Sequence, residues 1–220
     1  MKQKTVTLIL LTLIMEATVS GQVQGEDSFK RNSFSFLFSP QVSWIRSDHN
    51  AVDSNGSVFG FDFGILYDRF FDKNYAFTTG VVVNSTGGKL SYRDTIPANI
   101  GGEIVDVVDL DYKLKYLEIP LGLKLFTKYF RRTRYYGEMG LYLGFNIKAR
   151  DGNGKALGEE VKLFDSGYHI GGGMYYSLGG TTNLMFGLRY NAGFNDITSN
   201  DAIDDKTNLQ RVEFRFGLVF

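Results

Sequence analysis

Charged side chains recur at every second position inside stretches of this sequence that are otherwise apolar. In the last nine residues, Glu213 and Arg215 alternate with aromatic and aliphatic residues. Charges of both signs on one face can form ion pairs and hydrogen bonds, because a charge removed from water needs a partner. They could instead line a gate or a narrow path for ions. The residues that share this pattern are Asp62, Glu118, Lys124, Glu138, Lys148, Arg189, Glu213 and Arg215.

Other chemistry has weaker support. His49 follows Ser47 and Asp48, residue types that together perform acyl transfer. Because sequence neighbours rarely converge on one reacting atom, and a catalytic triad is defined by its geometry, we interpret this segment as a solvated loop. The segment 151–154 begins like a calcium loop but lacks the later acidic ligands. We therefore predict no catalytic residue, no metal site and no cofactor.

β-Strands are the elements that must position these charges. On the last strand, apolar residues occupy one side from Val212 to Phe220, and this period of two indicates a strand with one apolar face. Eight segments alternate in this way, an even number that is typical of bacterial barrels. They begin near Phe34, Phe59, Tyr75, Asp109, Glu138, Tyr168, Leu184 and Val212. Within 109–126 the apolar phase changes by one residue after Tyr116, which predicts a β-bulge on that strand.

The apolar face could point inward, as in a soluble eight-stranded barrel of the lipocalin type, or outward into lipid. The second face is rich in glycine, which would make room inside a narrow barrel. The first face carries more large rings than a small interior could hold. Aromatic residues near strand ends suit the interfacial girdles of a membrane barrel: Trp44, Tyr67, Tyr75, Tyr112, Tyr135, Tyr176 and Tyr190. The sequence therefore favours lipid outside and charges inside.

The connections alternate in length. Short turns are expected at 68–74, 127–134 and 179–182, and longer loops at 47–57, 91–108, 151–162 and 195–208. In outer-membrane barrels the short turns are periplasmic and the long loops are extracellular. The predicted fold is thus all-β: an eight-stranded antiparallel transmembrane up-and-down β-barrel with short periplasmic turns and longer extracellular loops.

The N-terminus has the layout of a secretory signal peptide over residues 1–21, with Lys2 and Lys4 before an apolar run and small residues after it. The barrel domain would then span residues 22–220. Without residues 1–21 the chain keeps 22 basic and 23 acidic residues, so no basic excess is available for nucleic acid. The sequence contains no cysteine, which excludes disulfides and thiolate metal sites.

Two stretches resemble known proteins. The C-terminal strand with Phe214, Phe216 and the final Phe220 is similar to the assembly signal of bacterial outer-membrane barrels, which implies the assembly machinery as a partner. The string Tyr116, Leu117, Glu118, Ile119 and Pro120 resembles the signature of the PorT-like outer-membrane barrels of Bacteroidetes. That resemblance implies an architecture related to the small OmpA and OmpX barrels. The founding member of the family belongs to a machinery that secretes gingipain-type proteins.

The leading hypothesis is a non-enzymatic, porin-like protein of the cell outer membrane whose polar lumen is plugged. Its loops would serve surface binding or slow permeation, and its partners would be outer-membrane lipid and an unidentified extracellular ligand. Two alternatives remain: a component of a protein secretion apparatus, and a lipid-modifying enzyme that uses His49.

Overall fold

The computed structural model describes residues 30–47, 52–157, 161–197 and 207–220. The predicted signal peptide, residues 1–21, lies outside these ranges, as do Asp48 and His49. The described chain forms nine strands: β1 (Asn32–Ser47), β2 (Val52–Ser54), β3 (Ser57–Asp72), β4 (Tyr75–Ile100), β5 (Glu103–Phe126), β6 (Thr133–Arg150), β7 (Phe164–Gly179), β8 (Thr182–Gly193) and β9 (Thr207–Val219). Among the described residues, no helix has the length and apolar character needed to cross a membrane.

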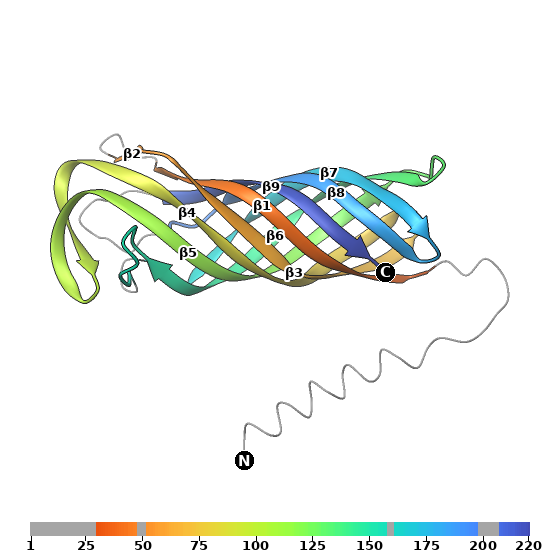
Figure 1. Ribbon diagram of the computed structural model, residues 1–220, viewed down its shortest axis with the longest axis horizontal. Helices are drawn as coiled ribbons and strands as arrows, with labels where there is room; N and C mark the ends of the chain where they lie inside the picture. The colour runs from red at the N-terminus through yellow and green to blue at the C-terminus, as the bar shows by residue number, and fades with distance from the viewer. Residues whose placement is uncertain (1–29, 48–51, 158–160, 198–206) are drawn as a thin grey trace, which may run out of the picture.

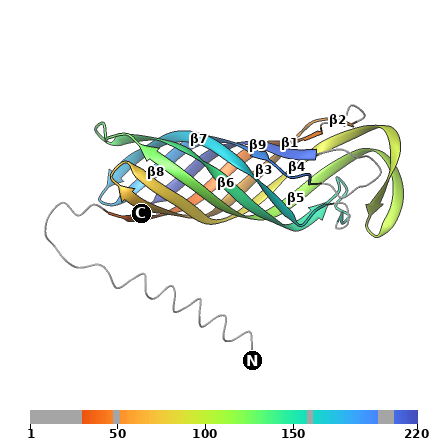
Figure 2. The same cartoon turned by 180° about the vertical axis from the view of Figure 1, so that it is seen from behind.

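The eight long strands close into a barrel. Each pairs antiparallel with its neighbours in the order β4, β3, β1, β9, β8, β7, β6, β5, and pairing of β5 with β4 completes the ring. The strands are strongly tilted around the cylinder, as Figures 1 and 2 show from opposite sides. The three-residue β2 pairs only with β4. The predicted closed, eight-stranded antiparallel barrel is confirmed.

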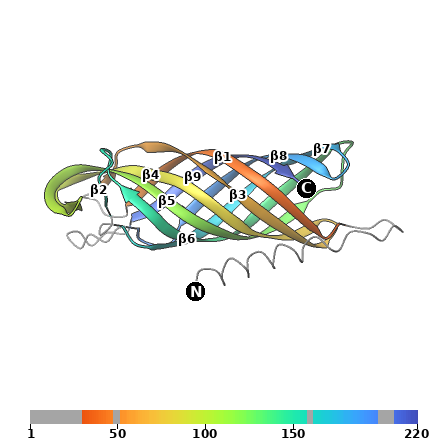
Figure 3. The ribbon, with the colours of Figure 1, turned by 60° about the horizontal axis from the view of Figure 1, so that its bottom comes forward.

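The two ends of the barrel differ. At the end that we call the turn end, tight connections join β3 to β4, β5 to β6 and β7 to β8. There β1 also meets the C-terminus, because Phe34 and Phe220 exchange backbone hydrogen bonds of 3.1 and 2.8 Å. At the opposite loop end, β4 and β5 project far beyond the other strands and curl over, as Figures 1 and 3 show.

The projecting hairpin corrects one prediction. Residues 91–108 were expected to form a loop, but β4 continues to Ile100 and β5 begins at Glu103. Gly101 and Gly102 form the tip with φ of 69° and 89°, the left-handed conformation that a two-residue hairpin turn requires. The alternation there is irregular because the register shifts between Ser91 and Ile96, where β4 holds extra residues. Because of this irregularity, the sequence shows no period of two that would predict the outer part of β4.

The β-bulge predicted within 109–126 is also misplaced. On β5 the even-numbered residues from Leu110 to Phe126 are all buried, so this strand keeps one phase throughout. The extra residue lies on β6: Lys115 is opposite Lys148, whereas Tyr116 is opposite Asn146, which leaves Ile147 over. The apolar pattern on β5 changes because the surroundings of the strand change, and not because its backbone slips.

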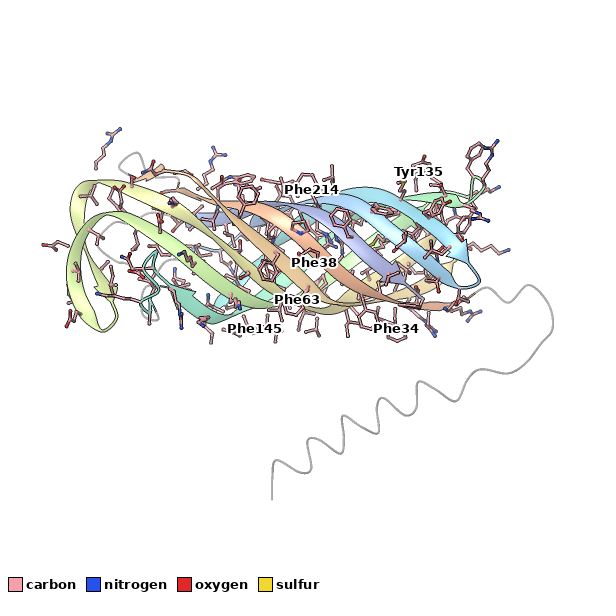
Figure 4. The ribbon with its side chains drawn as sticks, in the orientation of Figure 1. Phe34, Phe38, Phe63, Tyr135, Phe145 and Phe214 are labelled. Atoms are coloured by element: carbon pink, nitrogen blue, oxygen red, sulfur yellow. The ribbon has the colours of Figure 1, made fainter. Side chains whose placement is uncertain are left out.

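An apolar belt surrounds the outside of the barrel. Its rings include Phe36 and Phe38 on β1, Phe63 on β3 and Phe214 on β9, all of them exposed. In Figure 4 the labelled side chains, Phe34, Phe38, Phe63, Tyr135, Phe145 and Phe214, project from the outer surface of the wall. The opposite positions on the same strands face the barrel interior, where the buried charges lie. The strand alternation thus separates the two chemistries.

Candidate functional site: the barrel lumen

The lumen receives charged side chains from six of the eight long strands. Ten aspartate, glutamate, lysine and arginine residues from these strands are buried inside it: Asp62, Asp68, Glu118, Lys124, Glu138, Asp165, Arg189, Arg211, Glu213 and Arg215. They come from β3, β5, β6, β7, β8 and β9. Successive side chains of a strand point to opposite faces of the barrel wall. The side chains that point into the lumen are therefore the sequence neighbours of those on the outer surface.

Glu138 accepts hydrogen bonds from two arginines inside the lumen. Arg189 Nε lies 2.8 Å from Glu138 Oε1, and Arg215 Nη1 donates to the same oxygen. All three side chains are almost completely buried. Charge-assisted bonds of this kind are stronger than neutral ones, and removal of either partner would leave the other charge buried alone.

Arg211 connects a second group. Its Nη2 lies 2.6 Å from Glu118 Oε2, and its Nε lies 3.0 Å from Glu213 Oε1. The amide of Asn84 donates to the other oxygen of Glu118 at 2.7 Å. Asn191 donates to Glu213 at 2.7 Å, so each carboxylate has an arginine and an amide as partners. The Arg211 guanidinium also lies 4.9 Å from the centre of the Tyr142 ring.

Lys124 forms a third group nearer the turn end. Its Nζ is 3.0 Å from both carboxylate oxygens of Asp68 and 3.3 Å from the hydroxyl of Tyr175. Thr78 donates to Asp68 at 2.6 Å. Both charged side chains have no exposed surface, so the pair is held away from water by its surroundings.

An apolar layer lies between this last group and the turn end. Phe70, Phe126, Tyr136 and Tyr175 pack ring against ring, with centroids 5.2 to 6.0 Å apart. The aliphatic residues Leu37, Leu66 and Met185 belong to the same buried cluster. The guanidinium of Arg134 lies 4.3 Å from the centre of the Phe126 ring. We call this cluster the turn-end layer.

A second apolar cluster fills the loop end. Its members come from the barrel wall, the hairpin and the connecting loops: Ile45, Leu90, Tyr92, Ala98, Ile100, Leu110, Tyr112, Leu114, Tyr116, Leu157, Val161, Ile197 and Leu209. The hairpin tip is tied to the β6–β7 connection, because Gly101 donates its backbone N–H to Ala156 at 2.9 Å. This loop-end layer is a hydrophobic core surrounded by strands and loops.

Seven of the eight predicted lumen charges are buried inside the barrel: Asp62, Glu118, Lys124, Glu138, Arg189, Glu213 and Arg215. Lys148 was predicted wrongly, since it is exposed on the outer surface. The bulge at Ile147 turns Ala149, in place of Lys148, towards the interior. A period of two carried through from Glu138 cannot anticipate that extra residue.

Sequence reasoning omitted Arg211, Asp68 and Asp165 from the lumen set. Arg211 could have been found, because it lies two and four residues before Glu213 and Arg215 and shares their phase. Asp68 likewise shares the phase of Asp62. Asp165, whose carboxylate accepts a hydrogen bond of 3.1 Å from Tyr142, precedes the segment recognised as a strand. No signal in the sequence pairs these residues with their partners.

The two predicted motifs have different surroundings. Phe214, Phe216 and Phe220 are exposed on the outer wall at the C-terminal end. In the other motif, Tyr116 packs in the loop-end layer and Glu118 binds Arg211, while Leu117 and Ile119 face outward. The β4–β5 ladder is interrupted opposite Ile119 and Pro120, because proline has no N–H to donate.

The described residues hold no group of three or more metal-ligating side chains.

A family model described as "Outer membrane protein beta-barrel domain" matches residues 22–199. The chain belongs to this family. It is therefore a protein of the cell outer membrane, and the apolar belt is the surface that contacts lipid. No curated protein matches the sequence.

Solved structures with a similar course of the chain include three outer-membrane proteins. The Neisserial surface protein A has a TM-score of 0.49 at 16% identity, with 84% of this chain and 95% of that chain covered. OprG from Pseudomonas aeruginosa has a TM-score of 0.47 at 13% identity, covering 86% and 95%. Ail of Yersinia pestis has a TM-score of 0.40 at 14% identity, covering 86% and 99%.

Proposed function

We propose that this protein is a non-enzymatic outer-membrane barrel with a plugged lumen, which serves the cell surface through its loop end. Three successive layers support the plug: the turn-end layer, the charge network and the loop-end layer. An ion would have to displace packed rings at one end and a hydrophobic core at the other. Eight strands leave an interior that side chains alone can fill.

The observation that carries this proposal is that charged side chains bind one another inside the barrel, between two buried apolar clusters. An ion path needs polar groups that face water from one end to the other. Here the buried charges bind one another: Glu138 holds two arginines, and Arg211 is shared by two glutamates. These ion pairs join strands across the lumen, and the charges that form them already have partners, which makes them less available to a passing ion.

The loop end is proposed to face the outside of the cell. Tight connections and the C-terminus lie together at the turn end, as in outer-membrane barrels whose short turns are periplasmic. The projecting β4–β5 hairpin would then stand above the membrane, held by its contact with the β6–β7 connection. A hairpin held in place by such a contact loses less entropy on binding than a free loop, and this suits recognition of a surface ligand.

Conductance measurements test the plug. The full chain, inserted into a planar bilayer at 1 M salt, is expected to give no stable current steps, whereas a porin inserted in the same way gives them. Stable steps from the unmodified chain would overturn the proposal. If steps appear and disappear on Arg215→Gln, the path runs through the charge network.

Labelling of single cysteines tests the orientation, and the absence of native cysteine makes each label unambiguous. Ile104→Cys lies on the hairpin, and Phe130→Cys lies in the β5–β6 turn; these residues are 78% and 72% exposed. In intact cells, a membrane-impermeant maleimide is expected to label the first variant and to spare the second. The reverse result would place the turn end outside.

The secretion and enzyme hypotheses rest on fewer observations. The resemblance of residues 116–120 to PorT-like proteins suggests a secretion role, but the buried Tyr116 and the Glu118–Arg211 ion pair support a packing role for the string. A deletion strain with normal protein secretion would end the secretion hypothesis. The enzyme hypothesis depends on His49, and unchanged lipid profiles in a His49→Ala strain would end it.

A further inference from the structure

Four cationic side chains lie together on the outer wall of the barrel, at the limit of the apolar belt towards the loop end. Lys113 and Lys115 on β5 lie opposite Arg150 and Lys148 on β6 in the strand register. We call these four residues the cation quartet. Lys113, Lys148 and Arg150 are exposed, and Lys115 is half-buried. The bulge at Ile147 creates the quartet, because it turns Lys148 outward beside Lys115.

Like charges that face each other across two strands repel, so the quartet costs stability unless an anion binds it. In the part of the chain that the structure describes, no member of the quartet has a carboxylate within ion-pair distance. Other loop-end lysines do: Lys89 lies 2.9 Å from Asp111, and Lys162 lies 2.5 Å from Asp196. Among the described residues, the one hydrogen bond that a quartet side chain donates joins Lys113 Nζ to the Gly152 carbonyl at 2.7 Å.

The surface beside the quartet forms a pocket of about 270 Å³. All four cations line it together with Phe59 and Phe61 of β3. Phe59 is 86% exposed. Between the rings and the cations, β4 contributes Ser85 and Thr86 to the lining, and Ser85 is opposite Lys115 in the strand register.

The neighbouring positions on both strands identify the kind of ligand. Towards the turn end, the outward residues following the quartet are Leu117 and Ile119 on β5 and Phe145 and Ile147 on β6. The cations therefore lie where the lipid-facing wall meets the polar layer. A molecule that fits both surfaces carries acyl chains and a phosphorylated headgroup, because lysine and arginine are the residues that bind phosphate oxygens.

We propose that the cation quartet binds the phosphate groups of lipid A, with the acyl chains of this lipid against the apolar belt below. Lipid A is the phosphorylated glycolipid anchor of the outer leaflet, so the assignment rests on the proposed orientation with the loop end outside. Lys115 and Lys148 contact the phosphate from opposite strands. Phe59 and Phe61 close the other side of the pocket around the sugar and the first carbons of the chains.

Binding to the purified full chain in detergent tests the proposal by native mass spectrometry. The probes are bisphosphorylated lipid A, the same lipid after removal of its phosphates, and cardiolipin. The unmodified chain is expected to prefer bisphosphorylated lipid A. The double variant Lys115→Gln/Lys148→Gln is expected to bind it about tenfold more weakly, which is the effect of losing two partly exposed ion pairs.

The matched control is Lys128→Gln/Arg132→Gln, which removes the same charge at the turn end, where both residues are exposed. This variant is expected to keep the affinity of the unmodified chain within twofold. Dephosphorylated lipid should bind the unmodified chain no better than lipid A binds the quartet variant. Equal binding of lipid A to the quartet variant and the unmodified chain would overturn the proposal. Cardiolipin binding of equal strength and equal dependence on the quartet would overturn the assignment to lipid A.

A stability measurement supplies a second readout that does not depend on the strength of the complex. In neutral detergent, the quartet variant should melt at or above the temperature of the unmodified chain, because repulsion is relieved. Added lipid A should raise the melting temperature of the unmodified chain and leave that of the variant unchanged. A shift of the same size in both proteins would contradict the site. Neither readout depends on conductance or on orientation in the cell, so a failure here is distinguishable from a failure of the proposed plug.

Discussion

Along β5, the apolar and the charged residues exchange faces between the two halves of the strand, although the backbone keeps one phase. Near the turn end, Glu118 and Lys124 point inward, and the leucines from 121 to 125 point outward. Near the loop end, Leu110, Tyr112 and Leu114 point inward, and Asp111 and Lys113 point outward. The phase of the strand is the same in both halves, so the polarity of its two faces is exchanged.

The change of solvent explains this exchange. Beside lipid, an outward charge is costly and an outward leucine is favourable, so the charges gather in the lumen and pair with each other. On the loop-end half of β5, the apolar residues are buried and the charges point outward, which is the ordinary arrangement of a globular protein in water. The polarity of a strand face therefore indicates the surroundings of that face. Only the strand register tells whether the face points into the lumen or outward.

Of the substitutions that compare the lumen with the loop end, we expect the largest loss of stability at Glu138. Replacement by alanine leaves Arg189 and Arg215 buried without this partner, and we expect the free energy of unfolding to fall by about 3–5 kcal/mol. Urea unfolding in lipid vesicles measures this loss. The control is Asp111→Ala at the loop end, where the carboxylate pairs with Lys89 at a partly exposed site. A loss at Glu138 as small as that of the control would show that the lumen is hydrated.

The loop-end layer should behave as a conventional core. Leu90 is completely buried there, so Leu90→Ala is expected to cost about 2–5 kcal/mol of local stability. Hydrogen exchange should show earlier opening of the hairpin amides, with the protection of the apolar belt strands unchanged. Ile104→Ala, at a residue that is 78% exposed, serves as the control. Simultaneous loss of protection in both halves would mean that they form one cooperative unit.

The outer wall should tolerate charge in one half only. Ile170 lies in the middle of β7 within the apolar belt, and Ile170→Arg is expected to cost about 2–4 kcal/mol in a lipid bilayer. The same substitution at Ile104 on the hairpin should change stability by less than about 0.5 kcal/mol. Folding yields and urea midpoints in vesicles compare the two variants. Equal costs at both positions would remove the distinction between a lipid-facing and a water-facing wall.

The smallest effect is expected for the ion pair between Lys89 and Asp111. A double-mutant cycle with alanine at both positions should give a coupling of about 0.2–1 kcal/mol, because both side chains are more than a third exposed and water screens their attraction. Raising the salt concentration should reduce the coupling further. A coupling above 2 kcal/mol that persists in salt would place this pair with the buried pairs of the lumen.

Several features of the barrel could be predicted from local sequence. The alternation in segments such as 212–220 predicts strands, and their even number and order predict a closed meander, which the structure confirms. Seven lumen charges could be placed correctly because each lies on an unbroken alternation with bulky outward neighbours. The hairpin beyond Ser91 could not be predicted, because the extra residues on β4 interrupt the period there.

The sequence by itself determined that strands of alternating chemistry would close into a barrel, because a period of two with an apolar face is a local property of each strand. Only the tertiary structure decided where the lipid-facing wall gives way to a water-facing one, and that Lys148 points outward. The reason is physical. Partners in the lumen such as Arg211 and Glu118 are 93 residues apart in sequence, and a single extra residue at Ile147 reverses every side chain beyond it.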